Sequence, residues 1–178
     1  MKHIKFSFFG LLLIGITALS LMTACKKDNQ TEQEFITKIV VHLSGAGFDK
    51  EFVWQDRDGD GGAAPLIDTI SIPANVQLSA SLHVFDESQT PVADVTEEIK
   101  AENTAHLFVY KNSVAGLTIS DLNTDNNGKP FGLESKWTTT TVSSGLVEIL
   151  LHHEPTDKTA AEPGGEIDFD VAFPVKVR

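Results

Sequence analysis

Apolar and polar residues alternate at every second position along most of the chain after residue 34. Between residues 76 and 84, for example, the even-numbered positions are apolar and the odd-numbered positions are polar. This period of two is typical of a β-strand that buries one face. It predicts nine strands, bounded by Gly, Pro, Asn or Asp, at residues 35–44, 48–55, 66–72, 76–84, 105–111, 116–122, 133–142, 146–153 and 166–177.

One segment departs from this period. Asp94, with Glu97 three residues later, resembles a capping box with an acidic cap, and Val95 and Ile99 have the i, i+4 spacing of one helical face. We expect a short helix at 94–103. Short alternating strands with frequent turn signals are typical of two packed sheets. The sequence therefore predicts an all-β fold, a single antiparallel β-sandwich of the immunoglobulin-like or fibronectin-like kind.

The last predicted strand has the longest apolar face of the chain. Pro174 interrupts its polar side, and because proline cannot donate to a ladder, we expect this position at a sheet edge or with its nitrogen facing outward. The alternation places Asp168 and Asp170 on the face opposite the apolar one. That apolar face comprises Ile167, Phe169, Val171, Phe173, Val175 and Val177.

The first 24 residues have the pattern of a lipoprotein signal peptide. Basic residues precede an apolar segment of 17 residues, 6–22, and Ala24 then stands directly before Cys25. We expect a diacylglycerol on the Cys25 thiol and cleavage before it, so that added acyl chains hold the protein on the outer membrane. The periplasmic and the surface-exposed face both remain open. The alternative is an uncleaved anchor helix with an incidental cysteine.

The polar residues that follow predict a tether. Residues 25–34 contain the lipidated cysteine and nine polar residues, which span about 30 Å when extended. The remaining 35–178 is long enough for one domain with a proper core. Cys25 is the single cysteine of the chain, so the domain has no thiol for a disulfide, a thiolate metal site or a cysteine nucleophile.

The charge of the chain excludes one class of partner. The formal net charge is −11, and loss of Lys2 and Lys5 with the signal peptide leaves 12 basic against 25 acidic residues, a net charge of −13. Such a surface repels phosphate backbones and anionic headgroups. We therefore expect no nucleic acid partner, and favour a cation or a basic protein surface.

The densest acidic stretch lies between the second and third predicted strands. Asp56, Asp58 and Asp60 alternate with Arg57 and Gly59, and the glycines of this stretch allow the backbone to curl around a hard cation. Ile67 stands where an EF-hand has its bidentate glutamate, so the loop is no EF-hand, although Asp68 next to it supplies another carboxylate. We predict a Ca²⁺ site at Asp56, Asp58, Asp60 and Asp68. The alternative is a solvated Asp/Gly turn without an ion.

Histidines give a second candidate site. His106 begins one predicted strand, and His153 ends another directly before Glu154. A set of histidines and a carboxylate binds Zn²⁺ or Cu²⁺, yet the spacing does not show that these residues meet. The alternative is that the histidines cap strands or make structural hydrogen bonds.

Several motifs together resemble a group of proteins. They are the stretch 54–62 followed by Pro65, the segments 95–99 and 106–110, His153-Glu154-Pro155, and 164–166 before a Phe-Pro-Val strand end. Together with the signal peptide, these motifs resemble those of short Bacteroidota envelope lipoproteins, which are often catalogued as type 1 periplasmic binding fold proteins. The resemblance covers nearly the whole mature chain. The resemblance implies an accessory role beside TonB-dependent outer-membrane receptors that import metals or nutrients.

Three function classes follow from these observations. The first is a lipid-anchored binding or docking module for such a receptor. The second is a structural or adhesive envelope lipoprotein that holds a stabilising ion and carries no cargo. An enzyme is the third and least supported, because the sequence contains no GxSxG, HExxH or phosphate-loop motif.

Overall fold

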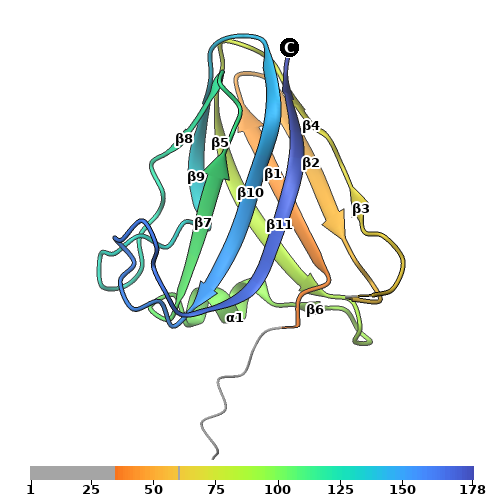
Figure 1. Ribbon diagram of the computed structural model, residues 1–178, viewed down its shortest axis with the longest axis vertical. Helices are drawn as coiled ribbons and strands as arrows, with labels where there is room; N and C mark the ends of the chain where they lie inside the picture. Colours follow the sequence, from red (N-terminus) through yellow and green to blue (C-terminus); the bar gives the residue numbers. More distant parts are fainter. Residues whose placement is uncertain (1–34, 60) are drawn as a thin grey trace, which may run out of the picture. The chain divides into compact units, whose positions relative to one another are not determined.

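The computed structural model describes residues 35–59 and 61–178, and within them the predicted all-β sandwich is confirmed (Figure 1). The predicted signal peptide at 1–24, the predicted lipidation site Cys25, the rest of the predicted tether and Asp60 lie outside these residues. The described chain forms eleven strands and one helix. They are β1 (Lys38–Gly45), β2 (Phe48–Gln55), β3 (Leu66–Ile67), β4 (Ile70–Ile72), β5 (Gln77–Asp86), β6 (Ala93–Asp94), α1 (Thr96–Ala101), β7 (His106–Asn112), β8 (Leu117–Ser120), β9 (Glu134–Thr139), β10 (Ser143–His153) and β11 (Glu166–Val177).

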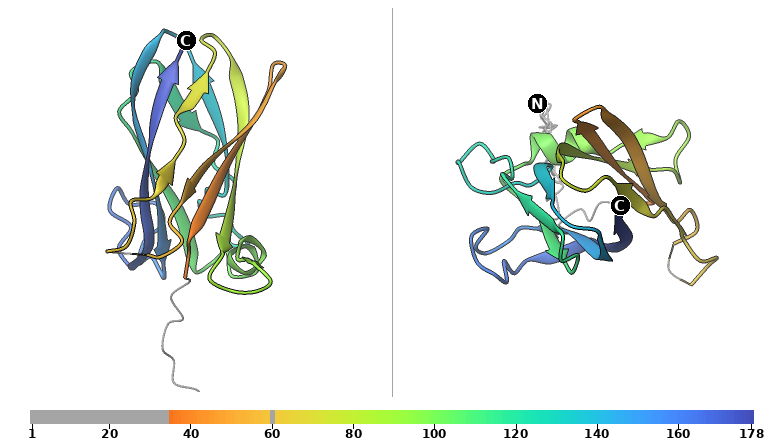
Figure 2. Two further views of the ribbon diagram at one scale, coloured as in Figure 1. Left: turned by 90° about the vertical axis from the view of Figure 1, so that its right-hand side faces the viewer. Right: turned by 90° about the horizontal axis from the view of Figure 1, so that it is seen from above.

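These strands form two sheets that face one another. Sheet A has seven strands in the order β3-β2-β1-β5-β9-β8, with β6 paired to β5, and it curls around sheet B (Figure 2). Sheet B has four strands in the order β4-β11-β10-β7. The inward residues of both sheets form one core, in which Trp137, Phe108 and Phe173 are completely buried.

The prediction of a wholly antiparallel sandwich is wrong for one pair of strands. The single strand predicted at 66–72 divides at Asp68 into β3, which pairs with β2, and β4, which runs parallel to β11. Asp68 ends the first pairing, because its backbone N–H donates to Val53 O and its carboxylate accepts the Val53 N–H, each at 2.9 Å. The chain then crosses from sheet A to sheet B without reversing, which makes the second pairing parallel.

Pro174 lies where the sequence led us to expect it. It pairs with Leu146 of β10 on one side, and on the other side β4 pairs only with Val175, Lys176 and Val177. At Pro174, β11 therefore has a paired strand on one side alone within the described chain, so the missing donor disrupts no second ladder.

The short helix is confirmed inside the predicted range. Asp94 belongs to β6, and its carboxylate accepts the Thr96 N–H at 3.0 Å at the start of the helix. Val95 and Ile99 both point into the core, as their spacing predicts. Glu97 pairs with Lys100 on the solvent side and does not complete a capping box. Among the described residues, no helix is long and apolar enough to cross a membrane.

A buried ion pair fastens the long connection between β10 and β11 to the rest of the domain. Lys158 Nζ lies 2.8 Å from Asp125 Oδ2 and donates to Asn103 O, and the two charged side chains are only 6% and 2% exposed. Burial alone would raise the pKa of Asp125, but hydrogen bonds from Lys158 and from two backbone N–H groups lower it. The connection is thereby held to the loop between β8 and β9 and to the turn after α1.

Loss of this ion pair is expected to destabilise the domain. Lys158→Met leaves a buried carboxylate without its cation and should lower the free energy of unfolding by about 3 kcal/mol. The matched control is Lys100→Met, which breaks the exposed pair with Glu97 and should cost less than about 0.5 kcal/mol. Urea denaturation measures both, and equal losses would show that the buried pair does not hold the connection.

Candidate metal centre

Two of the histidines singled out in the sequence meet at one end of sheet B. His106 of β7 and His153 of β10 are directly paired across the ladder. Their rings stack with centroids 4.7 Å apart and an angle of 22° between their planes. Both side chains are buried on the inward face, in line with Phe108 and Leu151 of the core.

A β-bulge adds a carboxylate to this pair. Leu151 pairs with Phe169, but the next residue of β10, His152, pairs with Ile167, so Asp168 is the extra residue. A bulge changes the direction of side chains locally. Asp168 Oδ1 consequently lies 3.8 Å from His153 Nδ1, and the Asp168 side chain is 0% exposed.

The bulge also corrects the predicted apolar face of the last strand. Regular alternation would place Asp168 outward and Ile167 inward. Ile167 is instead 46% exposed, and the continuous apolar face begins at Phe169. The sequence prediction of an uninterrupted face from Ile167 to Val177 is wrong at this one position.

His106, His153 and Asp168, called here the His/Asp cluster, have the composition of a metal site. One ligand atom from each residue lies within 4.8 Å of the other two. Among residues 35–59 and 61–178, this is the one group of three potential ligands that meets so closely. Two imidazoles and a carboxylate suit zinc and several other divalent transition metals.

The end of α1 orients one of the histidine rings. His106 Nδ1 lies 3.2 Å from the backbone oxygen of Glu102, which caps the C-terminus of the helix. When Nδ1 donates this bond, Nε2 carries the lone pair that a metal needs. Metal-binding histidines are commonly held by such a bond from the other ring nitrogen.

Positive charge beside the buried Asp168 can come from two sources. A carboxylate removed from water is costly unless a cation or hydrogen-bond donors compensate it. His153 supplies a positive charge beside Asp168 only when its ring is protonated. A bound metal ion supplies that charge with both imidazoles neutral.

Glu154, the carboxylate that we predicted beside the histidines, is placed differently. Its side chain is exposed and its backbone φ is +46°, while its N–H donates to Ala105 O at 2.7 Å. Asp168 contributes the carboxylate in its place. Sequence reasoning missed Asp168 because the alternation assigned it to the opposite face, and the only local hint of irregular pairing was the preceding Gly164-Gly165.

The described carboxylates of the predicted calcium loop accept hydrogen bonds from the backbone nearby. Asp56 Oδ1 accepts the Gly59 N–H at 3.1 Å, and Asp58 Oδ2 accepts the Ala63 N–H at 2.9 Å. The hydrogen bond from Ala63 lowers the pKa of Asp58. Asp68 is engaged with Val53 in the ladder between β2 and β3. These bonds agree with a solvated Asp/Gly turn, and Ca²⁺ at this loop stays a prediction.

A cavity of about 570 Å³ lies beside the His/Asp cluster. We call it the acidic cavity, because Asp56, Asp168 and Asp170 line it. It is bounded by the segment before β1, the end of β2 with the turn that follows, and the first half of β11. Its apolar lining consists of Phe35, Ile36, Trp54, Ile167, Phe169 and Val171.

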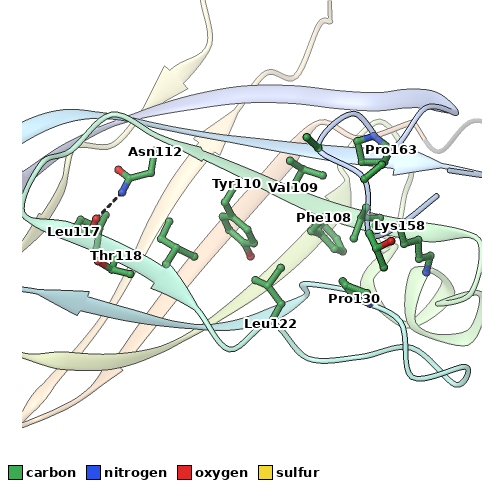
Figure 3. Close-up of a pocket in the computed structure, with 15 residues that line it drawn as sticks. Phe108, Val109, Tyr110, Asn112, Leu117, Thr118, Leu122, Pro130, Lys158 and Pro163 are labelled. Atoms are coloured by element: carbon green, nitrogen blue, oxygen red, sulfur yellow. Dashed lines mark hydrogen bonds between the residues drawn. The ribbon is translucent and has the colours of Figure 1, made fainter. Parts of the chain in front are cut away.

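A second cavity of similar volume lies between the edges of β7 and β8 (Figure 3). Its lining is mainly apolar and includes Phe108, Val109, Leu122 and Pro130. Tyr110 donates from its hydroxyl to Gly132 O at 2.7 Å, and burial raises the pKa of this phenol. No aspartate or glutamate is among its described lining residues.

Comparison of the chain with protein-family models, with curated proteins and with solved structures finds no match. The strongest indication of function is the geometry of the His/Asp cluster. That geometry combines burial, a shared inward face and an oriented imidazole.

A close backbone contact holds the strand ends that carry the His/Asp cluster. Gly165 has φ +82°, and a Cβ there would lie 2.2 Å from His153 O. Gly165→Ala should therefore lose about 2 kcal/mol of stability beyond the cost of its positive φ. Gly128→Ala is the control, because Gly128 has φ +73° and no atom within 4 Å of an added Cβ. Equal losses in chemical denaturation would rule out a steric role for this contact.

Proposed function

We propose that this protein is a lipid-anchored cell-envelope module that binds a divalent transition-metal ion through His106, His153 and Asp168. The observation that carries the proposal is the convergence of three buried side chains with ligand atoms within 4.8 Å of one another. Each comes from a different strand of sheet B, so the ladder itself sets their spacing.

The ligand types narrow the choice of ion. Residues 35–178 contain neither cysteine nor methionine, because Cys25, Met1 and Met22 all precede the domain. Soft ligands suited to Cu⁺ are therefore missing from the domain sequence. Imidazole and carboxylate ligands suit Zn²⁺, with Cu²⁺ as the main competitor. Three protein ligands leave a coordination position for water or an outside group.

The His/Asp cluster must contract when it binds zinc. Tetrahedral ligands about 2.0–2.1 Å from the ion are roughly 3.3 Å from each other. The present separations extend to 4.8 Å. We expect rotation of the Asp168 side chain and of the His153 ring to bring the atoms together.

The location of the protein is the second part of the proposal. Lipid on Cys25 and the tether at 25–34 would hold the domain at the outer membrane. The acidic mature chain supports a partner with a basic surface. The resemblance to envelope lipoproteins supports a TonB-dependent receptor as that partner. Metal capture beside such a receptor is the role that joins these features.

Metal binding is tested on the mature lipoprotein purified in detergent. Isothermal titration with Zn²⁺ should give one ion per chain. Either His106→Phe or Asp168→Asn should weaken the affinity for zinc more than about 100-fold. Loss of a residue that only hydrogen-bonds a ligand already costs about 10–100-fold, and loss of a ligand should cost more. The control is His83→Gln, which removes a histidine outside the His/Asp cluster. Zinc at 100 times the dissociation constant should add about 2.7 kcal/mol to the stability of the wild type.

Two results would contradict metal binding at the His/Asp cluster. One is a wild-type protein that binds no zinc or copper. The other is unchanged affinity in both cluster variants. Thermal melts in chelator show whether each variant is folded, so lost binding is not mistaken for lost structure.

The envelope role makes a separate prediction. The native lipoprotein, cross-linked in intact cells and purified from membranes, should bring an outer-membrane receptor with it. A Cys25→Ala variant, which cannot carry the lipid, should lose most of that receptor because it is no longer held at the membrane. Mass spectrometry of the eluates measures this, and equal recovery from both forms would contradict anchored docking.

A further inference from the structure

The acidic cavity and the His/Asp cluster share one residue, and the inference drawn from this rests on the proposed metal-binding function. Asp168 is a member of the cluster and also lines the cavity. Neither His106 nor His153 is among the described lining residues. Asp168 is therefore the member of the cluster that adjoins the cavity, and its buried side chain would have to turn toward an ion there.

The other carboxylates of the cavity come from two separate parts of the fold. Asp56 follows β2 of sheet A, and Asp170 lies two residues beyond Asp168 in β11 of sheet B. Burial and the neighbouring Glu148 raise the pKa of Asp170, while Lys111 acts in the opposite direction. Together with Asp168, Asp56 and Asp170 place three carboxylate residues around the cavity, and a cleft of one sign of charge attracts ions of the opposite sign.

Of the two large cavities lined by described residues, the one between β7 and β8 is the poorer path for a cation. The cavity between β7 and β8 has Phe108 and Tyr110 in its lining, and the charged residue among its described lining is Lys158, an ammonium (Figure 3). A cation gains nothing from an apolar wall and is repelled by an ammonium group, even one paired with Asp125. The two cavities are similar in volume, so charge and not size distinguishes them.

We infer that the acidic cavity is the path by which a hydrated divalent cation reaches the His/Asp cluster, with Asp56 and Asp170 attracting it and Asp168 receiving it. Clefts lined by one sign of charge concentrate counter-ions and raise association rates. Asp168 belongs to both the cavity lining and the His/Asp cluster, because the bulge directs its carboxylate toward His153. The ion exchanges its water for Asp168 before the imidazoles complete the coordination.

Stopped-flow transfer of Zn²⁺ from a fluorescent chelator to the mature lipoprotein tests this path. Asp56→Asn with Asp170→Asn should lower the association rate constant about tenfold at low ionic strength. Asp49→Asn with Glu51→Gln is the control, because it removes the same charge from exposed positions of β2 and should leave the rate unchanged. The difference should shrink at high salt, where exposed charges are screened.

The possible results separate the path from the site. If the wild type takes up zinc but the cavity variant does so at the wild-type rate, the path is wrong and the metal site stands. If the wild type takes up no zinc, the proposed function itself fails. Because Asp56 also accepts the Gly59 N–H, Asp170→Asn is measured alone as well, and it should retain a several-fold slowing. If the control variant Asp49→Asn with Glu51→Gln slows zinc association as much as the cavity variant does, the effect comes from net charge alone and the proposed path is wrong.

Discussion

The β-bulge between β10 and β11 is the constraint on which the candidate site depends. The side-chain period of a strand is two, so a shift of one residue in register moves a side chain from one face of the sheet to the other. At the bulge this shift carries Asp168 from the outer face to a position 3.8 Å from His153, and it leaves Ile167 at the surface. Without it, the paired histidines would have no carboxylate beside them.

The rest of the sandwich makes that local arrangement rigid. The long ladders of β10 with β7 and β11 fix the position of His153, and the completely buried Phe108 lies two residues from His106 in the same strand. The end of α1 orients His106 through Glu102 O, and Gly165 permits a backbone approach that a side chain would prevent. Preorganised ligands of this kind lower the cost of binding an ion.

The strand alternation was enough to predict the fold class and the position of the helix. It also identified His106 and His153 as candidates, because His106 begins one predicted strand and His153 ends another. It could not predict that they are neighbours, since these two residues are 47 positions apart in the chain and meet only through the pairing of β7 with β10. The acidic loop is a different case, because its dense local motif predicted a cation and the structure shows Asp56 and Asp58 accepting backbone N–H groups, which leaves that prediction open.

Asp168 and the division of the third strand escaped prediction for the same physical reason. A bulge and a crossover between sheets are decided by the partner strands, whereas alternation reports only the strand's own sequence. Asp68 looked like a metal ligand or a mid-strand polar residue, yet it ends one ladder by bonding Val53. Asp168 looked like a surface residue, yet the register of β10 turns it inward.

The central claim is that His106, His153 and Asp168 form a metal site, and a crystal structure of the zinc-loaded protein tests it most directly. Diffraction data collected on both sides of the zinc absorption edge locate the ion independently of any assumed ligand. We expect one anomalous peak about 2.0–2.2 Å from a nitrogen of each histidine and from an Asp168 oxygen. A zinc peak elsewhere in the domain, with the three side chains at their present separations, would contradict it.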